Sequence, residues 1–236
     1  MPLANPAASF WRNCTVFDEQ MIEMLWEGVI DTLYMTIAST ALSYVFGMIM
    51  GVLLVICRKD GIAPRPMLYA CLDVVVNLTR SFPFLILMIA VIPVTRFIVG
   101  TTIGNNATIV PLVIAAAPFV ARLIEASLLE VDGGVVEAAQ SMGASTWQII
   151  TKVLLPEALP SLLNGSAVAA ITILGYSAMA STIGGTGLGQ IAIIYGHQRL
   201  NPDITWICVF LTVIIVQVIQ ELGTRIAHKC DKRIKH

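Results

Sequence analysis

The chain has 236 residues, of which 57% are hydrophobic and only 12% are charged, and its mean hydropathy is +0.82. Soluble domains carry about 25% charged residues, so the composition excludes an ordinary soluble domain and indicates a protein with several membrane spans. The net charge of −1 and the separation of the basic residues into different loops exclude an extended basic surface for nucleic acid.

Long apolar segments follow one another along the chain and predict an all-α, polytopic membrane protein with about five transmembrane helices. These segments cover residues 32–57, 67–94, 109–129, 159–183 and 204–227. Residues 1–20 lack the basic and apolar regions of a cleavable signal peptide, so the first span is expected to remain as an anchor. The Gly-rich stretch 183–189 is expected to break the fourth helix at the outer face, and residues 188–203 to form a short apolar hairpin or loop. The whole chain, 1–236, is expected to form one domain.

The cysteines do not indicate a disulfide framework or a metal site. They are odd in number and mostly lie near or inside apolar segments, where small buried hydrophobes are the expected role. Their positions are Cys14, Cys57, Cys71, Cys208 and Cys230. No metal ligand is predicted among them.

Lysine and arginine are divided unevenly between the two sides of the membrane that five spans would create. One side holds Arg58, Lys59, Arg65, Lys152, Arg225, Lys229, Lys232, Arg233 and Lys235, and the other side holds Arg12, Arg96 and Arg199. The positive-inside rule places the richer side in the cytoplasm. The sequence therefore predicts a cytoplasmic C-terminus, an N-terminus outside, and a cytoplasmic loop over residues 130–156.

The loop 130–156 has the pattern of two short helices joined at a glycine. Gly143 suits the position just past a helix end, where a left-handed backbone is accessible without a Cβ atom. Ser145, followed three residues later by Gln148, has the pattern of a capping box and predicts the start of the second helix. Pro156 marks where that helix stops or hands over to the next element.

A spaced motif runs through the same loop. It consists of Glu137-Ala138-Ala139, then Gly143 after three residues, then Val153-x-Leu155-Pro156 after nine residues. This motif resembles the signature of the permease subunits of ABC importers and departs from it only in Val153, where the family has isoleucine. The position of the loop before the penultimate span is also typical of that family. Segments 80–83, 122–131, 183–189 and 194–199 extend the similarity, and over nearly the whole chain the sequence resembles the five-span permease of the methionine importer.

The resemblance implies a permease of the bacterial inner membrane that imports methionine, in its L- and D-forms, by alternating access. It implies a complex of two permease copies, two ABC ATPase subunits that bind ATP and Mg²⁺, and an extracytoplasmic binding protein. The residues expected to couple the permease to the ATPase are Glu137, Ala138, Ala139, Gly143, Ser145, Thr146 and Pro156. Trp147, Ile149 and Ile150 are expected to anchor the coupling helix against its own membrane domain.

The chain itself carries no phosphate-binding loop. It contains neither a GxxxxGK[ST] sequence nor a Gly-Lys pair. ATP hydrolysis is therefore expected on a separate subunit, and the chain is expected to be neither an enzyme nor the holder of a cofactor.

Polar residues inside the spans are candidates for the transport pathway, because ionisable groups are costly in lipid. Asp73, Asn77 and Arg80 recur at helical spacing and share one helix face. That face would line the pathway, pair with another helix, or lie in an inner extension of the second span. Pro83 predicts a kink or the start of the span proper. The candidate pathway or gate residues are Arg80, Ser81, Pro83, Tyr176, Ser177 and Met179. The small residues of the fourth span also fit plain helix packing.

Other functions remain open at this point. The permease would alternatively carry another small amino acid or organic solute. A stand-alone secondary transporter would show inverted repeats and paired broken helices, which the sequence lacks. An intramembrane enzyme would need a base beside Ser177, and the membrane-proximal histidine, His197, lies beyond the Gly-rich stretch.

Overall fold

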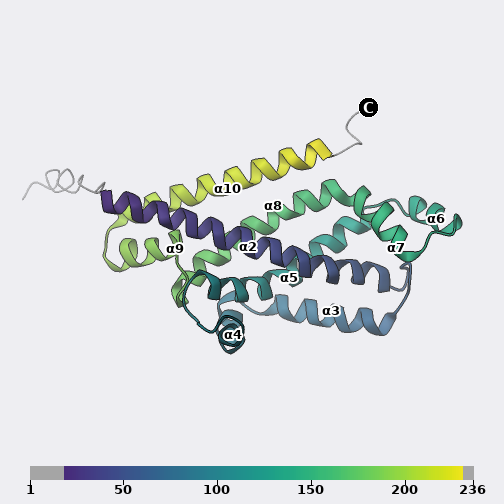
Figure 1. Cartoon of the computed structure of the whole chain (residues 1–236), viewed down its shortest axis with the longest axis horizontal. Helices are drawn as coiled ribbons and strands as arrows, with labels where there is room; N and C mark the ends of the chain where they lie inside the picture. Colours follow the sequence, from purple (N-terminus) through teal and green to yellow (C-terminus); the bar gives the residue numbers. More distant parts are fainter. Residues whose placement is uncertain (1–18, 231–236) are drawn as a thin grey trace, which may run out of the picture.

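The computed structural model describes residues 19–230, and the elements within that range are all helices joined by turns and loops (Figure 1). The longer helices are α2 (Glu19–Cys57), α3 (Pro66–Ser81), α4 (Phe84–Val99), α5 (Asn105–Leu129), α8 (Leu155–Ala180) and α10 (Pro202–Cys230). The short segments are α6 (Gly133–Ser141), α7 (Thr146–Ile149), the π-helical η2 (Ile150–Leu154), the 3₁₀ turn η3 (Ser181–Ile183), α9 (Leu188–Ile191) and the π-helical η4 (Ala192–Gln198). The all-α fold predicted from the sequence is confirmed.

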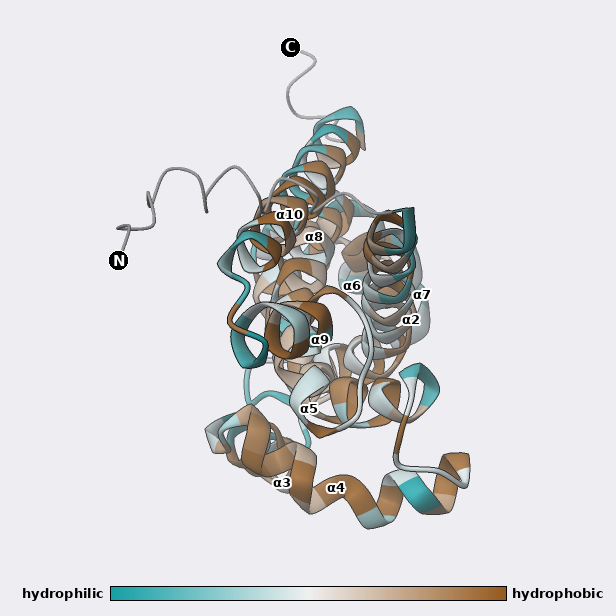
Figure 2. Ribbon diagram, turned by 90° about the vertical axis from the view of Figure 1, so that its left-hand side faces the viewer, coloured by the Kyte–Doolittle hydropathy of each residue, from teal (hydrophilic) through white to brown (hydrophobic). Residues whose placement is uncertain are grey.

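Four of these helical stretches are long and apolar enough to cross a membrane, and the bent pair α3–α4 brings the number to five if it counts as one span. Their outer faces are apolar: large side chains such as Phe97 on α4 and Trp206 on α10 are 90% and 71% exposed. Figure 2 shows these apolar ribbons on α3, α4 and α10, at the edges of the bundle. Such surfaces are expected of helices that face lipid or another membrane subunit rather than water.

The centre of the bundle is the close contact between α2 and α5. Two glycines of α2 make it possible: a Cβ atom on Gly47 would lie 2.6 Å from Val120 Cγ1, and one on Gly51 would lie 2.8 Å from the Ala121 carbonyl oxygen. Small residues allow helix backbones to approach closely in a membrane, where packing rather than water exclusion holds helices together. The two long helices therefore form a tight core on which α3, α4 and α8 pack.

The second predicted span, residues 67–94, is not one straight helix. The chain forms α3 and α4, which meet at an angle of 112°. Phe82 has extended backbone angles, φ −79° and ψ 132°, and Pro83 follows it. A residue before proline is pushed out of the helical region, and proline lacks the N–H that would continue the helix. The Pro83 kink expected from the sequence is thus a full break, and α4, seen end-on in Figure 1, lies at the edge of the bundle and turns away from the direction of α3.

The fourth predicted span, 159–183, begins earlier than expected. Helix runs from Thr146 to Ile183 over 38 residues and includes α7, η2, α8 and η3. Pro156 does not end it, because the π-helical turn before the proline shifts the pairing: the Leu155 N–H bonds to the Ile150 carbonyl, five residues back. Pro156 then stands in the first turn of α8 and hands the helix over without a stop.

The Gly-rich stretch does break the helix as predicted. Gly184 (φ +115°) and Gly187 (φ +98°) hold left-handed backbone angles on either side of the turn. The segment after it is helical, however, so the loop or hairpin expected over 188–203 is wrong. The segments α9 and η4 form there, and Leu200 (φ +57°) turns the chain into α10. The Leu188 N–H donates to Thr32 Oγ1 at 3.0 Å, which ties this segment to α2.

Candidate coupling segment and membrane pathway

The coupling segment consists of α6, α7 and the tight turn between them. We call this segment, residues 133–149, the corner. Asp132 caps the start of α6, its carboxylate accepting the Gly134 N–H at 2.7 Å. At the other end the Gly143 N–H donates to the Gln140 carbonyl at 2.9 Å, and the Ala144 N–H to the Ala139 carbonyl at 3.1 Å. This pair of bonds is the Schellman arrangement, with Gly143 at φ +78° in the left-handed position. The glycine-ended helix predicted at this position is observed.

The second helix starts with the predicted capping box. The Ser145 N–H donates to Gln148 Oε1 at 2.8 Å, and the Gln148 N–H donates to Ser145 Oγ at 3.4 Å. These reciprocal bonds satisfy two backbone donors that a helix start would otherwise leave free. Only one residue, Ala144, separates the Schellman glycine from the capping serine, so the direction of the chain between α6 and α7 is fixed by hydrogen bonds.

One face of the corner is buried and the other is open. Ala139, Ile149 and Leu154 are 5%, 1% and 4% exposed and belong to a core cluster that includes Val55, at the end of α2. Ile150 is buried beside them, so these side chains anchor the corner to the membrane domain as expected for Ile149 and Ile150.

Trp147 does not share that role. Its side chain is 71% exposed, and Met142 is 81% exposed. The prediction that Trp147 anchors the helix inward is wrong, because only Ile149 and Ile150 of this group are buried and the indole lies on the exposed surface of α7. Among the motif residues Glu137, Ala138 and Gly143 are also exposed, as are Ser145 and Pro156, whereas Thr146 is half-buried.

The candidate pathway residues are only partly brought together. Arg80, at the end of α3, and Tyr176, on α8, line the same cavity of about 180 Å³. The Tyr176 ring stacks on Phe84 of α4, with ring centroids 4.6 Å apart and an interplanar angle of 5°. Ser81 and Pro83 lie at the joint beside this cavity, where Ser81 Oγ donates to the Asn77 carbonyl at 2.8 Å.

Two of the predicted residues lie elsewhere. Ser177 is 2% exposed, and its hydroxyl donates to the Leu174 carbonyl at 2.8 Å within its own helix. Met179 is 48% exposed. Neither lines the cavity that Arg80 and Tyr176 share.

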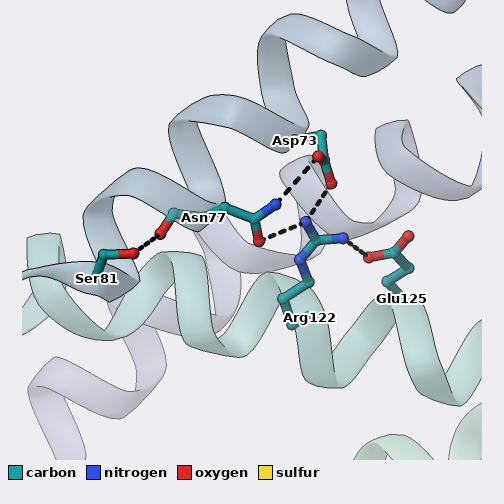
Figure 3. A network of polar contacts seen from close by, with 5 residues as sticks. All are labelled: Asp73, Asn77, Ser81, Arg122 and Glu125. Atoms are coloured by element: carbon teal, nitrogen blue, oxygen red, sulfur yellow. Dashed lines mark hydrogen bonds and ion pairs between the residues drawn. The ribbon is translucent and has the colours of Figure 1, made fainter.

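An ion-pair network links α3 to α5 and contains a residue that the sequence analysis did not select (Figure 3). Arg122 of α5 pairs with Asp73 of α3, donates to Asn77 Oδ1 at 2.9 Å, and pairs with Glu125 Oε2 at 2.6 Å. Asn77 Nδ2 also donates to Asp73 Oδ2 at 3.1 Å. The predicted stripe of Asp73 and Asn77 is therefore a structural contact, and Arg80 is not part of it. The sequence signal for Arg122 was its spacing of three residues from Glu125.

A second polar cluster lies at the opposite end of the bundle. The Thr186 hydroxyl lies 2.7 Å from Asp31 Oδ2 and also contacts Asn105, so the Gly-rich turn is bound to α2 and α5. The described part of the chain, 19–230, contains no group of three or more His, Cys, Asp or Glu side chains that could hold a metal ion.

The motif, the helical bundle and the broken span together define a membrane transport component, and comparison with known proteins gives its family. The family described as the inner membrane component of binding-protein-dependent transport systems matches residues 43–236, and this chain belongs to it. The resemblance to ABC-importer permeases is thereby confirmed, and with it the location in the bacterial inner membrane.

Two relatives and one solved structure are similar to this chain over most of its length. A Vibrio cholerae protein named probable D-methionine transport system permease protein MetI is 49% identical over 211 residues, which cover 89% of this chain and 94% of the relative. The methionine import system permease protein MetP of Bacillus subtilis is 46% identical over 209 residues, again 89% of this chain and 94% of the relative. A chain of the MetNI methionine ABC transporter, solved in inward-facing conformations, has a TM-score of 0.90 and 45% identity over 92% of this chain and 100% of that chain.

Proposed function

We propose that this chain is the membrane-spanning permease subunit of an ATP-driven importer that carries methionine into the cytoplasm by alternating access. The names of the MetI and MetP relatives and the MetNI structure support this substrate. The working complex contains two copies of the permease, two ATPase subunits that bind ATP and Mg²⁺, and an extracytoplasmic binding protein. The chain forms one domain, with its N-terminus outside and its C-terminus in the cytoplasm.

The observation that carries this proposal is the corner formed by α6 and α7. Hydrogen bonds at Gly143 and Ser145 fix its shape, and buried side chains such as Ile149 fix its base. Its outer face offers an acidic and two large apolar side chains: Glu137, Met142 and Trp147 are all exposed. A rigid protrusion with exposed apolar anchors and small residues for close approach is what docking into a groove of a soluble partner requires.

Each motif residue has a role in this docking. Glu137 offers a carboxylate to a basic group of the ATPase, and the methyl side chain of Ala138 lets the two backbones approach. Ala139 holds α6 to the membrane domain from the buried side. Gly143, Ser145 and Thr146 set the direction of α7, and Pro156 passes the helix on to α8.

The pathway lies at the bend between α3 and α4. Arg80, Ser81 and Pro83 stand at this bend, and Tyr176 reaches it from α8, whose next turn carries Ser177 and Met179. Closure of the ATPase pair displaces the corner, and the continuous helix from Thr146 to Ile183 carries that displacement to Tyr176. The gate therefore responds to the motor without containing any ATP-binding residue.

A charge reversal at the corner tests the coupling role. The Glu137→Lys variant is expected to reach the membrane normally, to release the ATPase during purification, and to lose ATP-driven methionine uptake in proteoliposomes. Glu130→Lys is the matched control, because Glu130 is an exposed acid of the same loop that precedes α6. Gly143→Leu, at φ +78°, is expected to behave like Glu137→Lys. Normal uptake by both Glu137→Lys and Gly143→Leu would refute the assignment of the corner.

The class of transporter is tested by reconstitution. The permease alone in proteoliposomes is expected to be inactive, and addition of the ATPase, ATP and the binding protein is expected to start methionine uptake. Uptake by the permease alone would show a secondary transporter instead. Competition of unlabelled amino acids, at equal concentration, with the uptake of labelled methionine identifies the substrate. An amino acid that competes more strongly than unlabelled methionine would take the place of methionine as the proposed substrate.

A further inference from the structure

The cavity at the break between α3 and α4 collects side chains from four helices. Thr79 and Arg80 come from the last turn of α3, Phe84 and Leu87 from the first turn of α4, and Tyr176 from α8. Phe82 of the joint and Ala115 and Phe119 of α5 complete a volume of about 180 Å³. Broken helices that line a cavity within the membrane are where transporters of other folds place their substrate sites.

Arg80 brings a positive charge into this cavity without a counterion from the chain. Its side chain forms no ion pair or hydrogen bond with any residue between 19 and 230. The nearby acids Asp73 and Glu125 are both engaged by Arg122. A cation inside a span is costly unless it is paired or placed where a ligand passes, so Arg80 is available to an anion that enters the cavity.

The backbone at the break favours the same charge. Helix α4 begins at Phe84 without a side-chain cap, and Phe84 and Leu87 of its first turn line the cavity. The N–H groups of Ile86 and Leu87 both donate to the Pro83 carbonyl at 3.0 Å, and the start of a helix carries a partial positive charge. The start of α4 therefore adds a partial positive charge to that of Arg80 at the border of this cavity.

The aromatic side chains supply the complementary apolar surface. Phe84 and Tyr176 are stacked with their ring centroids 4.6 Å apart, and Phe119 and Leu87 lie beside them. A thioether sulfur makes favourable contacts with aromatic rings. An unbranched apolar side chain attached to a carboxylate would thus find both of its parts matched in this cavity.

The amino group of such a ligand has no comparable partner. Asp73 is the nearest acid along α3, but it stands two turns from Arg80, about 10 Å along the axis, and it is already paired with Arg122. The carboxylate and amino groups of one amino acid lie only about 3 Å apart. The lining residues themselves include no Asp or Glu.

We propose that this cavity is a substrate subsite that binds the transported amino acid through its carboxylate, on Arg80, and its apolar side chain, on the Phe84–Tyr176 pair, and not through its amino group. This inference rests on the proposed function, since it takes the substrate to be methionine. It adds that the membrane subunit itself selects for a carboxylate.

The test uses two analogues that each lack one half of the amino acid. The complex of permease and ATPase, without the binding protein, is placed in nanodiscs and titrated with labelled methionine. We expect 4-(methylthio)butanoate, which lacks the amino group, to compete about as well as methionine. We expect 3-(methylthio)propylamine, which lacks the carboxylate, to compete about 10- to 100-fold less well, the loss that follows from removing a charge-assisted hydrogen bond.

Variants check that Arg80 is responsible. Arg80→Gln is expected to weaken methionine binding by about 10- to 100-fold, and Arg80→Lys to weaken it less. Arg96→Gln is the matched control, because Arg96 is an exposed arginine in the last turn of α4 and lies outside the cavity. ATPase activity of each variant complex verifies that it is assembled.

Equal competition by the amine and the carboxylate would overturn the subsite, and so would unchanged methionine binding by Arg80→Gln. A third contrary result is a wild-type complex that binds no methionine without the binding protein but still drives methionine uptake with ATP once the binding protein is added. In each case methionine uptake by the complete system would still stand, so failure of the subsite is distinguishable from failure of the proposed function. A complete system that takes up no methionine would overturn both.

Discussion

Removing Arg122 should detach α3 from the bundle, because one guanidinium holds most of its polar contacts to α5. Arg122 joins Asp73 and Asn77 of α3 to Glu125 of its own helix, while Val76 is the one residue of α3 that is fully buried. The Arg122→Gln variant leaves two carboxylates without their cation. Glu125 keeps only 10% of its side-chain surface exposed, so water does little to compensate.

The size of the effect follows from burial. Removing one partner of a buried ion pair costs about 3–5 kcal/mol. The side chains of Arg122 and Asp73 keep 21% and 31% of their surface exposed, so screening by solvent reduces the expected cost to about 2–3 kcal/mol. The exposed pair of Arg225 and Glu221 on α10, with 72% and 61% exposure, provides the matched control. Arg225→Gln should cost less than about 0.5 kcal/mol.

Hydrogen exchange of the α3 amides in the detergent-solubilised complex measures this cost locally. Protection over α3 should fall by roughly 30- to 150-fold in Arg122→Gln, and α5 should keep its protection. In a double-mutant cycle, Asp73→Asn combined with Arg122→Gln should cost less than the sum of the two single changes, by about 1–2 kcal/mol. Strict additivity, or an Arg122→Gln effect no larger than that of Arg225→Gln, would refute the conclusion that the network holds α3.

Three further substitutions probe other parts of the structure. Gly51→Ala places a methyl group 2.8 Å from a backbone oxygen and should lower the melting temperature of the complex, at a cost of about 1–3 kcal/mol, whereas Gly175→Ala, with nothing within 4 Å, should be neutral or stabilising. Ser145→Ala removes the side-chain half of the capping box and should cost about 1 kcal/mol. Amide hydrogen exchange should become faster at the start of α7 and not in α6. An equal increase in both helices would contradict a local cap. Gly187→Ala, at φ +98° with its Cβ 2.6 Å from Thr32 Oγ1, should break the Leu188–Thr32 bond and unfold α9 first, which exchange over 188–191 would detect; unchanged protection there would argue against the tether.

The corner was predictable from sequence because its signals are local. A glycine after one helix and a serine–glutamine pair at the start of the next specify hydrogen bonds within a few residues, and the structure has those bonds. Trp147 was not predictable in the same way, because the buried face of α7 depends on how the corner sits against α2 and α5. Spacing alone does not say which side of a short helix faces the bundle.

The polar residues of α3 illustrate the same limit. The spacing of Asp73, Asn77 and Arg80 places them on one helix face. It does not reveal that Arg122 of α5 pairs with both Asp73 and Glu125, so that the side chain of Arg80 is left without an ion-pair partner among residues 19–230. The break at Pro83 was expected, yet its angle of 112° depends on the packing of α4 against α5, which no local pattern encodes. Contacts between distant segments therefore determine both the partners of these polar side chains and the angle between α3 and α4.

The helix that runs from Thr146 to Ile183 has a mechanical consequence. A straight α-helix of its 38 residues would span about 57 Å at 1.5 Å per residue. If it moves as a rod pivoting at the corner, one degree of rotation shifts the far end by about 1 Å, and Tyr176, about 45 Å along, by about 0.8 Å. A rotation of only about four degrees would then slide the Tyr176 ring by about 3 Å against Phe84, nearly the diameter of a water molecule. A rotation of a few degrees at the corner is thus enough to displace a side chain near the other end of this helix by the distance that opens or closes a gate.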